Sequence, residues 1–158
     1  VSRNRIPTME ALKALVRLLS SAKINHLQLY MEHTFASKGH DEVWRGSSPF
    51  TATELRELDE YCRAHFVCLV PCQATLGHMH RWLTHEAYRP LAEVPDGVVH
   101  PFGTEREPFS LCPTDERSFS LVRALLDQLV PLFETNLQSE WPLVNINMDE
   151  PFDILGRH

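Results

Sequence analysis

The stretch "LVNINMDEPFD", residues 143–153, joins an apolar run directly to two acidic residues and a proline. The apolar members of the run are Leu143, Val144, Ile146 and Met148. Such a run predicts a buried strand, which would normally end in turn residues rather than in Asp149 and Glu150. Since adjacent side chains on a strand point to opposite faces, the two acids either lie on a solvated loop or have separate roles in a site.

Strands and helices alternate along the rest of the chain. Apolar residues at helical spacing predict the helices, and short apolar runs predict the strands. In chain order the sequence predicts a helix over 6–22, a strand over 26–31, a helix over 51–66, a strand over 67–71, a broken helix over 74–93, a long helix over 112–135 and the strand over 142–150. The residues before Pro7 would be the end of an earlier strand, and residues 38–50 and 94–110 are predicted loops.

Local signals support the predicted helices. Thr51 and Glu54 have the spacing of a capping box, and Pro131 is expected to end or kink the long helix. The predicted buried stripes are Leu12, Leu15, Val16, Leu19 and Ala22 in the first helix, Leu55, Leu58 and Cys62 in the second, and Phe119, Val122, Leu125, Leu126, Leu129 and Val130 in the long helix.

The order of elements indicates an α/β fold in which helical crossovers join parallel strands, either as an open sheet or as a (β/α)8 barrel. Both architectures place active sites at the carboxyl ends of the strands. Polar residues follow the predicted strands at that edge: Glu32, His33, Gln73, His78, Asp149 and Glu150. The phosphate-binding patterns GxGxxG and GxxxxGK[ST] do not occur, which disfavours a nucleotide-binding open sheet.

The composition narrows the class of protein. The 158 residues, 43% of them apolar, suffice for one core, so a single domain over 1–158 is expected. The formal net charge of −6, without a basic run, disfavours a nucleic-acid partner, and no apolar stretch is long enough to span a membrane. Four cysteines without a CxxC pair predict buried free thiols and favour a cytoplasmic location; secretion is the alternative if a leader precedes Val1.

Two groups of residues are candidates for acid–base chemistry and binding. One acid of the pair Asp149 and Glu150, in an apolar setting, would have a raised pKa and act as a general acid, while the other stays ionised. Gly77 would turn the chain after a strand and bring His78 to the same edge; a hydrogen-bonded structural histidine is the alternative. Arg3, just before the first helix, could bind sugar hydroxyls or a carboxylate, as could Arg5; surface arginines are the alternative.

Two further groups leave alternatives open. His80, with His78, His33 and a carboxylate, would be a metal-ligand set, whereas a solvent-facing His80 on a helix needs no metal. The three tryptophans could stack on a sugar or simply pack within the protein: Trp44, Trp82 and Trp141.

Taken together, "VSRNRIPT", "LGHMHRWL" and "NINMDEPFD" resemble the catalytic domain of glycoside hydrolase family 20, the β-N-acetylhexosaminidases. The three motifs occur in the family's order and span nearly the whole chain. The Asp–Glu pair at a strand end is the most specific of them, and the Gly–His turn is the next.

The resemblance implies a role for each matched residue. Glu150 would be the general acid/base, and Asp149 would orient the 2-acetamido group of the substrate. That group itself attacks the anomeric carbon in this family, so hydrolysis retains configuration without a glycosyl-enzyme bond. Arg3 would bind hydroxyls at the non-reducing end, and His78 would support the acid. Glu32 and Trp82 are further candidates for substrate binding at the same edge.

The resemblance also implies partners and an architecture. The substrate would be a glycan or glycoside with a terminal N-acetylhexosamine, and neither a metal ion nor another cofactor is expected. The fold would be a (β/α)8 barrel, which needs about 250 residues, so this chain would cover the first half. A half barrel leaves sheet edges open, and pairing with another copy is one way to complete it. A metal-dependent barrel hydrolase and a non-catalytic carbohydrate-binding fragment are the competing interpretations.

Overall fold

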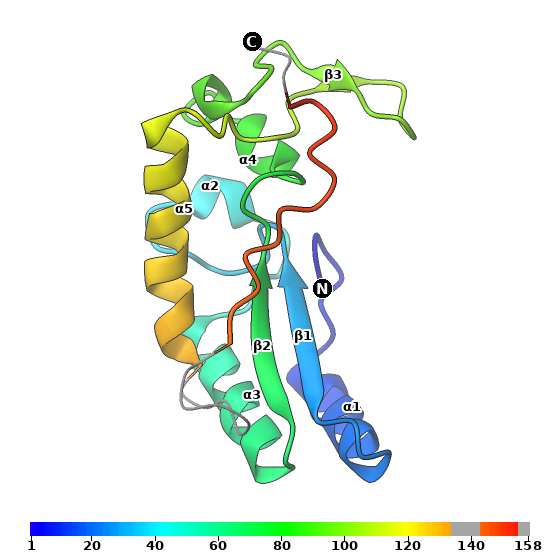
Figure 1. Cartoon of the computed structure of the whole chain (residues 1–158). Coiled ribbons are helices and arrows are strands. Elements are labelled where there is room, and N and C mark those ends of the chain that lie inside the picture. The colour runs from blue at the N-terminus through cyan, green and yellow to red at the C-terminus, as the bar shows by residue number, and fades with distance from the viewer. Residues whose placement is uncertain (134–142, 155–158) are drawn as a thin grey trace.

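The computed structural model describes residues 1–133 and 143–154, and its centre is a pair of parallel strands (Figure 1). Strand β1 (His26–Met31) pairs with β2 (Cys68–Gln73) over their whole length, with His26 opposite Cys68 and Met31 opposite Gln73. The other elements are α1 (Met9–Ser21), α2 (Asp41–Trp44), α3 (Ala52–Ala64), α4 (His80–Leu83), η1 (Arg89–Leu91), β3 (Val98–Val99), β4 (Arg106–Glu107), α5 (Glu116–Leu129) and η2 (Val130–Leu132). Parallel strands joined by a helical crossover are thus confirmed.

Helices α1 and α3 pack against the strands and enclose the first part of the core (Figure 1). The predicted stripe of α3 is fully buried. In α1 the buried stripe is narrower than predicted, because Leu15 is 38% exposed. This core cluster contains Leu12 and Val16 of α1, Leu29 and Met31 of β1, Leu55, Leu58 and Cys62 of α3, and Leu69 of β2.

A second core cluster lies beyond the carboxyl ends of the strands, where α4 and α5 meet. It includes Met79, Trp82, Leu83, Leu91, Leu111, Leu121 and Leu125. Helix α5 faces it with Ser118, Leu121 and Leu125, whereas Phe119 is 65% exposed, so the prediction of a buried Phe119 is wrong. The reason is geometric: Phe119 and Leu121 lie about 200° apart around the helix and cannot share a face.

The apolar run at residues 143–148 lies beside β2 and continues the parallel arrangement (Figure 1). The backbone N–H of Gln73 donates to the Asn145 carbonyl at 3.0 Å, and that of Thr75 donates to the Asn147 carbonyl at 2.9 Å. The run forms one isolated bridge, Cys72 to Asn145, rather than a regular strand. Its burial was predicted wrongly, since Ile146 and Met148 are 51% and 54% exposed; none of the described residues covers them.

The predicted loops contain short elements that periodicity cannot detect. Residues 38–50 include α2, and residues 94–110 include the antiparallel hairpin of β3 and β4. At the N-terminus, residues 1–5 form no strand, although the N–H of Glu32 donates to the Ser2 carbonyl at 3.0 Å.

Other sequence predictions concern single features. All four cysteines are buried and free, as predicted. Pro131 lies in η2, where α5 ends, which is also as predicted. Within the described ranges, none of the helices has the length and apolar character needed to cross a bilayer.

Thr51→Ala should reduce the free energy of unfolding by about 1 kcal/mol, because the capping box at the start of α3 loses its side-chain oxygen. In that box the N–H of Glu54 donates to Thr51 Oγ1, and the N–H of Thr51 donates to Glu54 Oε2. Urea unfolding of the full-length protein measures the change. Thr53→Ala, an exposed threonine of the same helix, is the control, and an equal effect of both variants would contradict the capping role.

Candidate active site

Three chain segments bring their polar residues together at the carboxyl end of the strand pair. Glu32 directly follows β1, His78 lies in the turn after β2, and Asp149 and Glu150 follow the run beside β2. Arg3 reaches the same place from the N-terminal segment. The predicted convergence of Glu32, His78, Asp149 and Glu150 at one edge is therefore observed, and Arg3 joins them.

Glu32 is a buried carboxylate, 1% exposed, whose charge is compensated by Arg3. Arg3 Nε donates to both carboxylate oxygens at 3.0 Å, and the Tyr30 hydroxyl donates to Oε1 at 3.2 Å. Burial, followed by the charge of Glu32, raises the pKa of Tyr30 and keeps its proton in place. Among the described residues Glu32 is enclosed by Arg3, Tyr30 and His78, and its role in substrate binding stays a prediction.

His78 connects this ion pair to the two neighbouring acids. Its Nδ1 lies 3.4 Å from Arg3 Nη2 and 3.6 Å from Glu32 Oε1. Its Nε2 lies 3.3 Å from Glu150 Oε2 and 3.9 Å from Asp149 Oδ2. When Nδ1 accepts a hydrogen bond from Arg3, the ring proton is on Nε2 and is directed at the acids.

Asp149 and Glu150 both face His78 instead of pointing to opposite sides. The backbone explains this, because Glu150 has a φ of 46° and so leaves the extended conformation in which neighbouring side chains alternate. The two side chains are 60% and 56% exposed, so the apolar enclosure expected for one of them is not provided by the described residues. The acids thus lie on an irregular segment, yet they share a partner.

Gly77 allows the backbone of the two acids to come this close. A Cβ at Gly77 would overlap the carbonyl oxygen of Asp149 and would lie 3.2 Å from the carbonyl carbon of Glu150. The next residue, His78, has a φ of 59°, which turns its ring back toward the strands. Glycine is required at this position by the close approach of the segment that follows in space, not by its own torsion angles.

Asp153 holds the far end of the acidic segment, and the sequence analysis missed it. Its side chain is 5% exposed, and its Oδ2 accepts a hydrogen bond from the Ser110 backbone N–H at 3.1 Å. The Asp149–Glu150 segment is thus fixed at one end by Gly77 and at the other by Asp153. The presence of a third acid, three residues after Glu150, was the feature of the sequence that could have indicated it.

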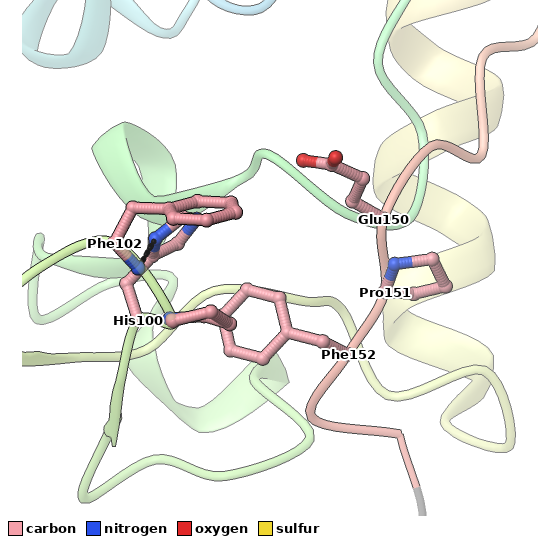
Figure 2. Close-up of a pocket in the computed structure, with 6 residues that line it drawn as sticks. His100, Phe102, Glu150, Pro151 and Phe152 are labelled. Carbon is pink, nitrogen blue, oxygen red and sulfur yellow. Dashed lines mark hydrogen bonds between the residues drawn. The ribbon is translucent and has the colours of Figure 1, made fainter.

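An aromatic wall, made of His100, Phe102, Phe109 and Phe152, stands beside Glu150 (Figure 2). Glu150, His100, Phe102 and Phe152 line a cavity of about 310 Å³. Figure 2 shows the ring of Phe152 next to His100, with Glu150 two residues before Phe152 on the same chain segment. Three of these rings belong to the predicted loop 94–110 and the fourth, Phe152, follows a proline, so only residue type could have indicated them.

The tryptophans do not form a sugar platform in the part of the chain that the structure describes. Trp82 is 2% exposed, and its indole N–H donates to the Glu32 carbonyl at 3.0 Å, so among the described residues it packs and holds the end of β1; its role in substrate binding stays a prediction. Trp44 is partly buried and donates to the Ser37 carbonyl, and Trp141 lies outside the described residues.

His33 and His80 are largely buried rather than solvent-facing, contrary to the expectation for His80. Burial, together with nearby cations, lowers the pKa of each to about 4. Over residues 1–133 and 143–154, no group of three or more His, Cys, Asp or Glu side chains could hold a metal ion. The described residues therefore do not support the metal-dependent interpretation.

Known proteins resemble this chain in sequence and in fold. No family model matches it. The curated protein "Hexosaminidase D" of Bos taurus is 28% identical over 126 residues, which are 80% of this chain and 34% of that protein. The chain thus spans about a third of this relative.

Solved structures of hexosaminidases share the fold. The Flavobacterium johnsoniae chitobiase matches with a TM-score of 0.74 and 18% identity, over 97% of this chain and 24% of its own. Streptomyces plicatus N-acetyl-β-hexosaminidase matches with a TM-score of 0.68 and 21% identity, over 96% and 31%. The Vibrio harveyi exo-β-N-acetylglucosaminidase, solved with N-acetylglucosamine, matches with a TM-score of 0.69 and 16% identity, over 92% and 26%. The resemblance to the family 20 catalytic domain is confirmed.

The buried histidines predict a stability that falls as the pH is lowered from about 6.5 toward 4. In this range the unfolded imidazole of His33 or His80 takes up a proton while the folded one does not, so protonation favours unfolding. Urea unfolding of the full-length protein across this range measures the slope. His33→Gln should flatten it, and His65→Gln, at a half-buried histidine after α3, should not. Equal slopes in all three proteins would contradict the assignment.

Proposed function

We propose that this chain is the first part of a family 20 catalytic domain and that the whole protein is a β-N-acetylhexosaminidase. It would remove terminal N-acetylhexosamine by the retaining, substrate-assisted route, without a metal ion or cofactor. One observation carries the proposal: His78 Nε2 lies within 4 Å of both acids, at 3.3 Å from Glu150 and 3.9 Å from Asp149, while its Nδ1 faces the Arg3–Glu32 ion pair.

Glu150 would act as the general acid and then as the general base. It protonates the glycosidic oxygen as the bond breaks and then removes a proton from the incoming water. The Nε2–H of His78 would stabilise the carboxylate in the intermediate state. His78 in turn is held by Arg3 and Glu32, which themselves form a charge-compensated pair. This network supports a fixed position for a side chain that is otherwise 56% exposed.

Asp149 would act on the 2-acetamido group of the substrate in the same reaction. The acetamido oxygen of the substrate attacks the anomeric carbon, and the acetamido nitrogen gains positive charge as it does so. A neighbouring carboxylate stabilises that charge and orients the group. The common orientation of the two acids toward His78 supports separate roles on one side of the chain, with Glu150 acting on the leaving oxygen and Asp149 on the acetamido nitrogen.

Two other features have a natural place in this scheme. Arg3 uses Nε for Glu32, its side chain is 51% exposed, and its remaining N–H groups are available for sugar hydroxyls. The aromatic wall beside Glu150 would face the leaving group, since the general acid must lie next to that group. An aromatic face packs well against the apolar face of a sugar ring.

The uncovered surfaces of the chain support an incomplete barrel. An apolar cavity of about 270 Å³, lined among others by Phe119, Val122, Ile146 and Met148, has no cover among the described residues. Further strands and helices of the same domain would bury it, either from the remainder of the same polypeptide or by association with a second copy. We favour the first arrangement, because the curated relative is about three times as long as the part matched.

Glu150→Gln should reduce kcat of the full-length enzyme by a factor of about 10² to 10⁴ while KM changes little, because the acid is lost but the binding groups remain. Asp149→Asn should also reduce kcat strongly. The measurement is release of the chromophore from an aryl N-acetyl-β-glucosaminide. Glu60→Gln, at an exposed glutamate of α3, is the charge-matched control.

The outcomes distinguish the candidate functions. A neutral Asp149→Asn would contradict the substrate-assisted assignment. Sugar binding without hydrolysis, in the wild type and in Glu150→Gln alike, would identify a non-catalytic carbohydrate-binding protein instead.

Gly77→Ala should reduce activity about 100-fold, because the new methyl group displaces the Asp149 carbonyl and moves both acids. Gly39→Ala is the control: its surroundings are empty within 4 Å, but its φ of 83° makes alanine strained. It should therefore lower Tm without changing kcat. Equal activity losses in the two variants would mean that destabilisation, not displacement of the acids, explains the effect.

A further inference from the structure

A second cavity, of about 300 Å³, shares Arg3 with the candidate active site but contains neither Asp149 nor Glu150. Its other charged and titratable lining residues are His33, Arg45, His80 and Arg81. Together with Arg3, these residues come from four separate places in the chain: the N-terminal segment, the residues after β1, the loop after α2 and helix α4. No carboxylate lines this cavity in the described part of the chain.

The arginines of this cavity leave positive charge without a matching acid. Arg3 is compensated by Glu32. Arg81 instead donates from Nε to the Val43 carbonyl at 3.0 Å and from Nη2 to the Arg45 carbonyl at 3.4 Å, and both acceptors are neutral. Within the described ranges, neither Arg45 nor Arg81 forms an ion pair with a carboxylate. The Arg45 side chain is exposed and available to a ligand.

The two histidines of the cavity add buried ring nitrogens without a hydrogen-bond partner to this positive charge. His33 is 7% exposed, and its Nδ1 has no hydrogen-bond partner among the described residues; the same holds for Nδ1 of His80. Burial and the cations Arg3 and Arg81 hold the pKa of both rings low, and no acid opposes them. The acids nearest to Arg45 in sequence, Asp41 and Glu42, act on His40. Buried nitrogens without a hydrogen-bond partner, beside guanidinium groups without a carboxylate, favour an oxyanion as the ligand of this cavity.

We propose that this cavity binds an oxyanion, namely a sulfate, phosphate or carboxylate group, carried by the sugar that Arg3 contacts. The inference rests on the proposed function and refines it: the preferred substrate is an N-acetylhexosamine with an anionic substituent. Guanidinium forks match the geometry of oxyanions, and Arg45 and Arg81 supply two of them. Because Arg3 lines both the site and the cavity, the anion and the sugar hydroxyls lie within reach of one arginine side chain.

The test compares sulfated and unsulfated substrates with the full-length enzyme. The substrates are 4-nitrophenyl N-acetyl-β-D-glucosaminide and its 3-, 4- and 6-sulfates. We expect one sulfated isomer to have a higher kcat/KM than the unsulfated compound. Arg45→Gln and Arg81→Gln should lower kcat/KM for that isomer about tenfold or more and change the unsulfated reaction less than about twofold. Arg56→Gln, an exposed arginine of α3, removes the same charge elsewhere and should change neither.

Arg45→Gln is the more informative variant, because Arg81 also holds backbone carbonyls and its loss could disturb α4. The proposal is overturned if no sulfated isomer is preferred. It is also overturned if the preference survives both substitutions or if Arg56→Gln abolishes it equally.

Calorimetric titration with inorganic sulfate at low ionic strength separates this inference from the proposed function. Sulfate binding that weakens about tenfold in Arg45→Gln supports an oxyanion site even if no glycoside is hydrolysed. In that case the proposed hexosaminidase activity is contradicted, whereas the oxyanion site is supported. Sulfate binding without preference for any sulfated substrate would assign the cavity to a free inorganic anion and overturn the substrate assignment. Absence of sulfate binding and of preference overturns the site altogether.

Discussion

The buried ion pair of Arg3 and Glu32 is the interaction on which the arrangement at the strand ends depends. A carboxylate that is 1% exposed must have a cation and hydrogen-bond donors around it, and Arg3, Tyr30 and the neighbouring His78 supply them. Leaving such a charge unpaired costs about 3–5 kcal/mol, so the N-terminal segment is held against β1. Through His78 the same pair sets the position of Glu150, which is distant from both partners in the sequence.

Two residues with strained backbone conformations lie at the same place. His78 and Glu150 both have positive φ angles, 59° and 46°, and each such residue costs about 1–3 kcal/mol. The two core clusters stabilise these conformations: α1 and α3 pack in one cluster, α4 packs in the other, and α5 contributes to both. Because Gly77 has no side chain, the turn that contains His78 can lie directly against the segment that contains Glu150. The strain is therefore what turns two adjacent acids toward one histidine.

Sequence periodicity predicted the regular elements well and the irregular ones poorly. Strand β1 and the cap of α3 were predicted correctly, because their signals are local. Phe119 and the run at 143–148 were predicted to be buried although burial depends on which neighbours are present, and a single segment does not contain that information. At the site, motif resemblance identified the residue types. It could not show that Trp82 is buried, that Asp153 anchors the acidic segment, or that His33 and His80 border a cationic cavity.

The cavity beside Glu150 and the cavity lined by Arg3 differ in the charge they favour, and this difference follows from where the acids lie. Glu150 and the aromatic wall give one cavity an acid and apolar rings, suited to a leaving group that must accept a proton. Arg45, Arg81 and two neutral histidines give the other an excess of donors, suited to a group that is already anionic. Since Glu32 neutralises Arg3, the arginine, which lines the second cavity and contacts His78, can act as a hydrogen-bond donor without imposing its full charge on a ligand. A substrate bound across Arg3 would then be oriented by charge at one end and cleaved at the other.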